Sequence, residues 1–273
     1  MEDVALLIQV MVLGSVAGLF GSLLGIGGGV FLVPFFVLVV GLPFPEAAAL
    51  GLVTVIATSS TVSAGNAGKG VFNFRLGIVL EMATALGGLC GGLTASLLSE
   101  RALRVIFSTV ASAIGVMVLL RAKRRNIITD PSIDPGRLGG RFLDSDTNQM
   151  VSYRVKRMPL ALAASFFAGN ISGLLGIGGG IVKVPILNAC CGIPLRVAAA
   201  TSSMMIGVTA LSTAPIYYAK GLLIPHLAAA AVIGVLIGSA AGMKIGVRAR
   251  ARYLKVMMGF VLFVAAAVMA WGA

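Results

Sequence analysis

The sequence LLGIGGGVFLVP at residues 23–34 returns almost unchanged as LLGIGGGIVKVP at residues 174–185. Aligned with itself at the resulting offset of 151 residues, the chain needs no gap over residues 18–107. Other residues with special backbone properties then coincide, for example Pro43 with Pro194. The glycine string is therefore repeated because a whole half of the chain is repeated, as expected for an internal duplication.

The composition predicts a protein that resides in lipid. Of the 273 residues, 58% are hydrophobic and only 11% are charged, and the mean hydropathy is +1.03. A soluble domain is about one quarter charged. The net charge of +12 would suggest nucleic-acid binding in a soluble protein. Here the basic residues gather in loops between apolar segments, which is the positive-inside pattern of membrane proteins, and nucleic acid is not an expected partner.

Ten apolar segments follow one another along the chain. Most are about 20 residues long, enough to cross roughly 30 Å of hydrocarbon, but the second and seventh are short and each directly follows a glycine string. The N-terminus lacks a basic region and an A-x-A cleavage pattern, so it is predicted to be a first span and not a signal peptide. The segments cover residues 4–24, 28–41, 46–66, 76–98, 104–121, 158–175, 180–193, 197–218, 227–247 and 256–272.

Three regions are predicted: an N-terminal membrane repeat at 1–121, a basic linker at 122–157 and a C-terminal membrane repeat at 158–273. The linker contains many turn-forming residues and no long apolar run, and it is expected to be solvated, mobile and cytoplasmic.

The fold class predicted is an all-α integral membrane protein. It consists of two inverted-topology repeats of about five helical segments each, with helices broken at the GIGGG motifs. If each short segment crosses the membrane, the basic residues fall on the inner side. Four crossings per half would instead place the cluster Arg248, Arg250, Arg252 and Lys255 outside.

The glycine triplets predict a functional break in each repeat. Each glycine disfavours a helix by roughly 1 kcal/mol relative to alanine, and lipid cannot satisfy the backbone groups that a break frees. A helix that starts at the break offers free N–H groups and the positive end of its dipole to an anion. Close helix packing is the alternative, and the spacing excludes a dinucleotide fingerprint. The candidate anion-binding glycines are Gly27, Gly28, Gly29, Gly178, Gly179 and Gly180.

Two ionisable residues lie within apolar segments. Lys183, whose counterpart in the first half is Leu32, either faces a cavity or a partner or extends to the membrane interface. Glu81 either carries a proton or pairs with Arg75 or another base. Three hydroxyl residues are candidates to bind substrate oxygens, or they satisfy the carbonyls of their own helix: Thr201, Ser202 and Ser203.

The sequence favours neither an enzyme nor a metalloprotein. Cys90, Cys190 and Cys191 lie in apolar stretches without ligand spacing, and His226 is the only histidine. There is no HExxH motif, no paired aspartate and no plausible Ser/His pair. No cofactor is expected.

The paired LGIGGGxxxVP strings, each followed by a short apolar run, a proline and an alanine-rich helix, resemble the TauE/SafE family. This family is also called the sulfite exporter or 4-toluene sulfonate uptake permease family. The resemblance covers nearly the whole chain outside the linker. The first half reads AALGLVT where the second reads AAATSSM, so the hydroxyl cluster is expected to act from the second half only. The resemblance implies a permease for small sulfur-containing anions such as sulfite, sulfoacetate or sulfonates.

We therefore expect a secondary transporter that spans a prokaryotic plasma (inner) membrane several times and works by alternating access. The anion is expected near the midplane between the two breaks, with Lys183 and the three hydroxyls completing its shell. Export is favoured over import because an inside-negative potential drives an anion outward without a coupling ion. An anion channel and a proton-coupled importer using Glu81 are the alternatives. The expected partners are the anion and the bilayer, and a homo-oligomer is left open.

Overall fold

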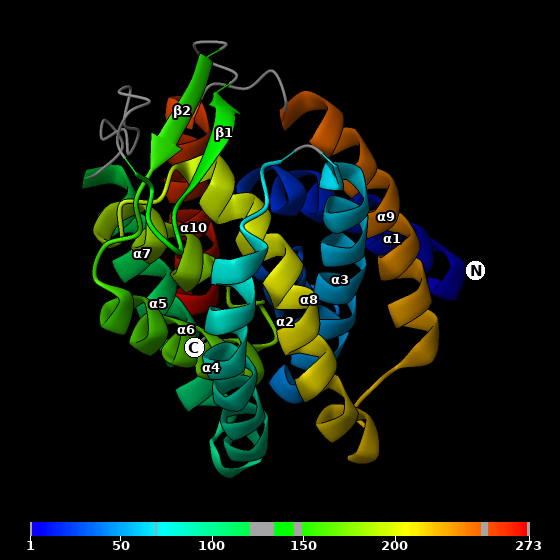
Figure 1. Cartoon of the computed structure of the whole chain (residues 1–273). Coiled ribbons are helices and arrows are strands. Elements are labelled where there is room, and N and C mark those ends of the chain that lie inside the picture. Colours follow the sequence, from blue (N-terminus) through cyan, green and yellow to red (C-terminus); the bar gives the residue numbers. More distant parts are fainter. Residues whose placement is uncertain (1, 69, 121–133, 145–148, 247–250, 272–273) are drawn as a thin grey trace.

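A computed structural model describes residues 2–68, 70–120, 134–144, 149–246 and 251–271, and in these residues the apolar segments form ten α-helices (Figure 1). The first half contains α1 (Glu2–Leu24), α2 (Gly29–Leu38), α3 (Phe44–Asn66), α4 (Phe74–Thr94), a 3-10 turn η1 (Ala95–Leu97) and α5 (Glu100–Leu120). The second half contains α6 (Met158–Leu175), α7 (Gly180–Cys190), α8 (Leu195–Ala219), α9 (Pro225–Gly246) and α10 (Ala251–Trp271).

The helices have the length and surface of membrane spans. Seven of those in the described residues are long and apolar enough to cross a bilayer, whereas α2 and α7 have only 10 and 11 residues. Large apolar side chains such as Met82 and Leu86 of α4 point outward, where lipid would cover them. The chain is therefore an all-α, multi-pass membrane protein, and this part of the prediction is confirmed.

The direction of each helix follows from the residues that it contacts. The backbone N–H of Asn73 donates to Thr201 Oγ1, and Thr209 Oγ1 donates to Glu81 Oε1, and both pairs are 128 residues apart. Because the separation stays constant along the two helices, α4 and α8 run parallel.

Helix α4 also runs parallel to α6. A Cβ on Gly87 would meet Phe166, and one on Gly91 would meet Asn170, so the contact advances along both helices together. Helices α6 and α8 therefore run in the same direction, which means that the short α7 between them returns the chain across the bundle.

The first helices of the two halves run in opposite directions. A Cβ on Gly14 would meet Ala231, and one on Gly18 would meet Val235, so the contact advances along α1 and α9 together. Helix α1 therefore runs parallel to α9. Helix α9 returns antiparallel to α8 (Figure 1), and α8 is parallel to α6. Helix α1 is therefore antiparallel to α6.

A feature that the sequence does not predict is a β-hairpin within the linker. Strands β1 (Gly140–Asp144) and β2 (Gln149–Tyr153) pair antiparallel, with Phe142 opposite Val151 and Gly140 opposite Tyr153. Phe142, Val151 and Tyr153 are buried against the helices. The expectation of a solvated linker is wrong for this part, because three apolar or aromatic side chains at alternate strand positions share one face. Most of the remaining linker lies outside the described residues.

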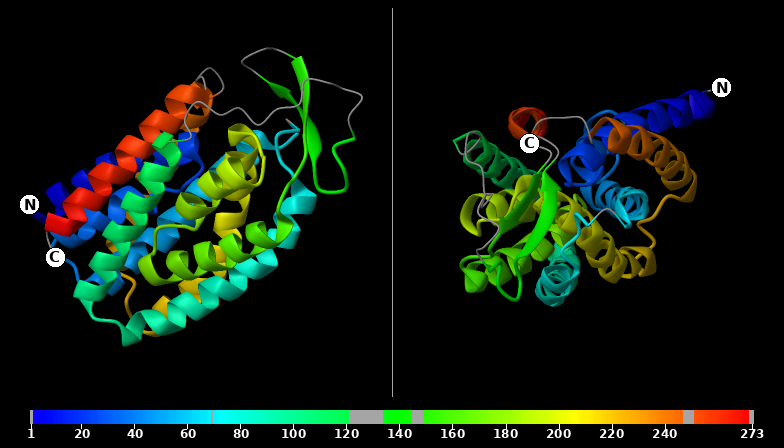
Figure 2. Two further views of the ribbon diagram at one scale, coloured as in Figure 1. Left: turned by 90° about the vertical axis from the view of Figure 1, so that its left-hand side faces the viewer. Right: turned by 45° about the horizontal axis from the view of Figure 1, so that its top comes forward.

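The hairpin covers one end of the helical bundle, here called the hairpin end (Figure 2). Asn73 Nδ2, at the start of α4, donates to the carbonyl of Leu138 and to the Tyr153 hydroxyl, each at 2.7 Å. Burial raises the pKa of the Tyr153 phenol, which keeps this hydroxyl protonated. The N–H of Lys156 donates to the carbonyl of Cys191, directly after α7, at 2.8 Å. The linker is thus bonded to the ends of α4 and α7.

Candidate functional site

Each GIGGG motif separates the first helix of its repeat from the second. Helix α1 ends at Leu24 before α2 begins at Gly29, and α6 ends at Leu175 before α7 begins at Gly180. Four glycines in the two breaks have φ between +70° and +82°, a conformation that L side chains rarely adopt: Gly25, Gly27, Gly176 and Gly178. These backbone angles explain why a helix cannot continue through the motif.

The two breaks cross each other inside the bundle through reciprocal contacts. A Cβ on Gly29 would meet the carbonyl of Gly176, and a Cβ on Gly180 would meet the carbonyl of Gly25. Residues 29 and 180, and residues 25 and 176, occupy equivalent positions of the repeat. Main chain therefore lies directly on main chain at this crossing, and glycine is required there for close approach.

Packing does not explain every glycine of the breaks. At Gly28, with φ −76°, a Cβ would have only ordinary contacts, the nearest being Thr58 Oγ1 at 3.5 Å. All six predicted glycines are buried. Among the described residues, no acceptor is found for the N–H groups of these six, so each break carries unsatisfied donors. Their anion-binding role stays a prediction.

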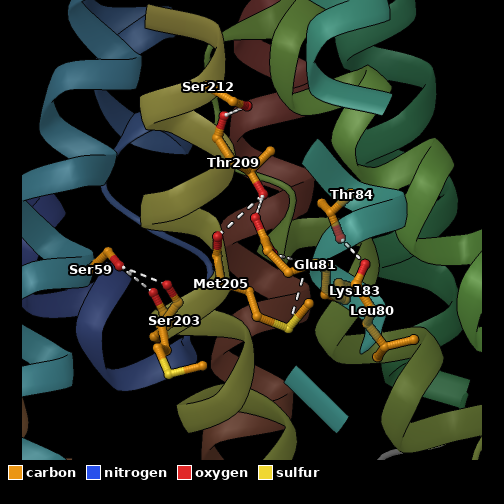
Figure 3. A network of polar contacts seen from close by, with 10 residues as sticks. Ser59, Leu80, Glu81, Thr84, Lys183, Ser203, Met205, Thr209 and Ser212 are labelled. Carbon is orange, nitrogen blue, oxygen red and sulfur yellow. Dashed lines mark hydrogen bonds and ion pairs between the residues drawn. The ribbon is translucent and has the colours of Figure 1, made fainter. Parts of the chain in front are cut away.

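The structure brings Lys183 and Glu81 together. Lys183, in the first turns of α7, is completely buried, and its Nζ lies 3.8 Å from Oε2 of Glu81 on α4, whose side chain is 13% exposed (Figure 3). The alternative in which Lys183 extends to the membrane interface is therefore wrong. Glu81 pairs with a base, but this base comes from the other half of the chain and is not Arg75. The two ionisable residues singled out by the sequence form one ion pair.

The ammonium group of Lys183 has few partners. Besides the Glu81 carboxylate, it lies 3.8 Å from the sulfur of Met205 on α8, and a thioether is a weak acceptor. No oxygen atom of the described residues lies within hydrogen-bond distance of it. A lysine ammonium can donate three hydrogen bonds. This cation is therefore poorly solvated by the protein and is suited to receive the oxygens of an anion.

The hydroxyl cluster at 201–203 is divided among different contacts. Thr201 accepts from the N–H of Asn73 at 3.0 Å, and the carbonyl of Ser203 accepts from Ser59 Oγ at 2.5 Å. Ser202 Oγ is buried and has no hydrogen-bond partner among the described residues. Thr201 thus has a structural contact, whereas Ser202 is available to a ligand, and a role of the cluster in substrate binding remains a prediction.

Sequence reasoning missed Thr209 and Met205, which complete the surroundings of the ion pair. The Thr209 hydroxyl donates to Glu81 Oε1 at 2.7 Å. The signal was the buried stripe Thr201, Met205, Thr209 and Thr213, spaced by four residues, on one face of α8. It faces the stripe on α4 that contains Asn73, Gly77 and Glu81.

The polar site occupies only one of two equivalent positions in the bundle, each of which takes one residue from each half. At the offset of 151 residues, Lys183 corresponds to Leu32, and Glu81 corresponds to Val232. Leu32 is buried, and Val232 is partly buried in the apolar core. The duplicated frame therefore holds a charged pair on one side and an apolar pair on the other.

The family model described as "Sulfite exporter TauE/SafE" matches residues 10–269. The chain belongs to the TauE/SafE family. It is a membrane transporter, as the names of its relatives also indicate. One from Bacillus subtilis (strain 168), "Probable membrane transporter protein YunE", is 26% identical over 92% of this chain and 93% of the relative.

Two further relatives support the same assignment. A "Probable membrane transporter protein" of Xylella fastidiosa (strain 9a5c) is 24% identical over 94% of this chain and 92% of its own length. A probable membrane transporter protein of Methanocaldococcus jannaschii is 24% identical over 96% and 94%. No solved structure matches this family member.

Removing one charge of the Lys183–Glu81 pair should destabilise the fold more than removing both. Lys183→Leu leaves a largely buried carboxylate without its counter-ion, which typically costs about 3 kcal/mol, whereas an apolar replacement of a whole pair is often neutral. The double variant Glu81→Val/Lys183→Leu installs the residue types found at the equivalent positions of the opposite halves, Val232 and Leu32. We expect thermal unfolding in detergent to show a clear loss for the single variant and recovery in the double. Equal losses in both would show that the charges do not compensate each other.

Proposed function

We propose that the chain transports a small sulfur-containing anion, of the sulfite, sulfoacetate or sulfonate class, by alternating access. The observation that carries this proposal is the buried, poorly solvated ammonium of Lys183 close to the N-terminus of α7. Lys183 follows Gly180, the first residue of α7, by three positions, and its own N–H donates to Gly179. The lysine charge and the helix N-terminus therefore act on the same region. The description of the family model as a sulfite exporter supports the choice of anion.

The anion is proposed to bind between Lys183 and the N–H groups of the two breaks, from Gly27 to Gly29 and from Gly178 to Gly180. A sulfonate or sulfite group presents three oxygens, and these match the donors that the protein leaves unused at Lys183. Ser202, whose buried hydroxyl has no partner among the described residues, supplies a further donor. Burial strengthens each of these contacts because no water competes for them.

The halves are proposed to form inverted-topology repeats with five crossings each. In support, α1 is antiparallel to α6, and α7 returns the chain between two parallel helices. The charges agree, because the hairpin end carries many basic residues and the opposite end few. Basic residues at the hairpin end are Arg75, Arg137, Arg141, Arg154, Lys156, Arg157, Arg196 and Lys244. At the opposite end, Arg101, Arg104 and Lys220 stand against Glu46 and Glu100.

The driving force depends on what moves with the anion. A single negative charge that moves alone gains about 2.3 kcal/mol per 100 mV when it leaves an inside-negative cell. A monovalent anion that moves with one proton carries no net charge, and the concentration gradients alone then set its direction. A channel would use the same donors but would need a continuous pore.

Transport should depend on the charged pair. In vesicles containing the purified protein, we expect flux of sulfite, sulfoacetate or taurine, measured with and without an imposed potential. The variant Glu81→Val/Lys183→Leu should lose at least about tenfold in flux, equivalent to 1.4 kcal/mol, because the anion loses its only buried cation in the described residues. The control Lys220→Leu removes an exposed lysine and should transport normally. Normal flux in a correctly folded double variant would rule out this site.

The breaks should contribute separately from the lysine. Gly28→Ala is compatible with the observed φ and has room for its methyl group, so the unfolding midpoint should change little. The methyl group should hinder close approach of the anion to the neighbouring N–H groups and reduce flux several-fold. Unchanged flux would indicate that the amides of the first break do not bind substrate.

Cysteine labelling should place the hairpin end inside the cell. In a variant lacking the three native cysteines, Lys220→Cys should react with a membrane-impermeant maleimide in intact bacteria. Arg154→Cys, on β2's exposed continuation, should react only after permeabilisation. Labelling of both residues from the same side would contradict the proposed topology.

A further inference from the structure

We propose that Glu81 acts as a built-in substitute for the transported anion: the anion displaces its carboxylate from Lys183, and Glu81 takes up a proton as it leaves. This inference rests on the proposed function and deepens it, because it assigns a coupling ion to the same site. It makes the chain a carrier in which anion and proton move together.

The geometry of the pair is that of a loosely held carboxylate. Oε1 of Glu81 is anchored by the Thr209 hydroxyl at 2.7 Å, while Oε2 has no hydrogen-bond partner among the described residues. Its separation from Lys183 Nζ, 3.8 Å, exceeds by about 1 Å the usual length of a charge-assisted hydrogen bond. The carboxylate therefore balances the charge of the lysine without filling its hydrogen-bonding capacity, and a ligand with better-placed oxygens can compete.

Charge balance requires a proton when the anion binds. Lys183 is completely buried, so it needs one negative partner in every state. An anion beside an ionised Glu81 would place two negative charges around one ammonium. If a proton binds Oε2 of Glu81, the lysine keeps its own proton and pairs with the anion. No other bond forms or breaks, and Thr209 can continue to donate to Oε1.

Among the residues that the structure describes, no other titratable group of the site could take this role. Helix α4 packs against α6 and α8, and α7 packs against α5, α6 and α8. The described part of α6 between its end residues contains no charged side chain, and the charges of α5 lie in its first turns, at Glu100, Arg101 and Arg104. The remaining groups lie at least about one and a half turns along their own helices from the residues of the site: Arg75, Cys90, Cys190, Arg196, Tyr217 and Tyr218.

Glu81 is also the less deeply buried member of the pair. Its side chain keeps 13% exposure, while Lys183 has none. With the two halves exchanged, the equivalent residues are Val232 and Leu32, and neither of them can titrate. One proton per transport cycle is therefore expected.

The experiment measures proton and anion movement together. Vesicles containing the protein and an internal pH dye receive a gradient of methanesulfonate, a sulfonate with a single negative charge that does not titrate, and the wild type should move one proton with each anion in the same direction. A pH series uses the same anion. Apparent affinity should rise as the pH falls, by up to about tenfold per pH unit where Glu81 becomes protonated.

Glu81→Gln removes the titrating group but keeps an oxygen that can accept from Thr209. This variant should transport the anion without a proton, respond to the membrane potential and lose the pH dependence of affinity. Glu46→Gln, a carboxylate at the opposite end of the bundle, is the matched control and should keep the coupling.

Two outcomes would overturn the role of Glu81 but leave the proposed transport function standing. One is anion flux through the wild type without proton movement, and the other is an unchanged pH profile in Glu81→Gln. The first needs no variant, so it holds even if Glu81→Gln fails to fold. If the wild type moves neither methanesulfonate nor sulfite, sulfoacetate or taurine, the proposed function itself is refuted.

Discussion

Bare main chain at membrane depth is the constraint on which this architecture depends. Lipid offers no hydrogen bonds to the backbone groups that a helix break frees, so a break must be covered by protein or water. In this chain each break is covered in part by the other, with Gly29 against Gly176 and Gly180 against Gly25. Helices of the opposite half cover them as well, with Ala199 of α8 against Gly25 and Ala48 of α3 against Gly176. Because each repeat covers the break of its partner, neither half of the chain can form this centre alone.

The two halves of the chain share one arrangement of helices, but they differ in the residues of the polar site. The helix contacts of one half have counterparts in the other: α1 lies parallel to α9 as α6 lies parallel to α4. The residues that distinguish the halves occupy equivalent positions of the repeat. Lys183 and Glu81 on one side stand where Leu32 and Val232 stand on the other. A symmetric scaffold with an asymmetric pair of charges allows one polar site while the rest of the bundle stays apolar.

Much of the fold could be predicted from the sequence because its signals are local. Apolar length predicts the spans, and the GGG triplets predict the breaks, since glycine disfavours helix wherever it occurs. The pairing of Glu81 with Lys183 could not be predicted in this way. It depends on the register of α4 against α8 and α7, which is set by contacts between residues about 100 or more positions apart. The sequence could identify both residues as unusual, but their pairing is a property of the packed helices.

The hairpin escaped prediction for a different reason. Its strands are only five residues long and lie among turn-forming residues, so alternation over so few positions is a weak signal. Asn73 links it to α4 and, through Thr201, to α8, while Lys156 links it to the end of α7. These three helices carry Glu81, Thr209 and Lys183. The segment that joins the two halves in sequence therefore also bonds helices of both halves to one another in space.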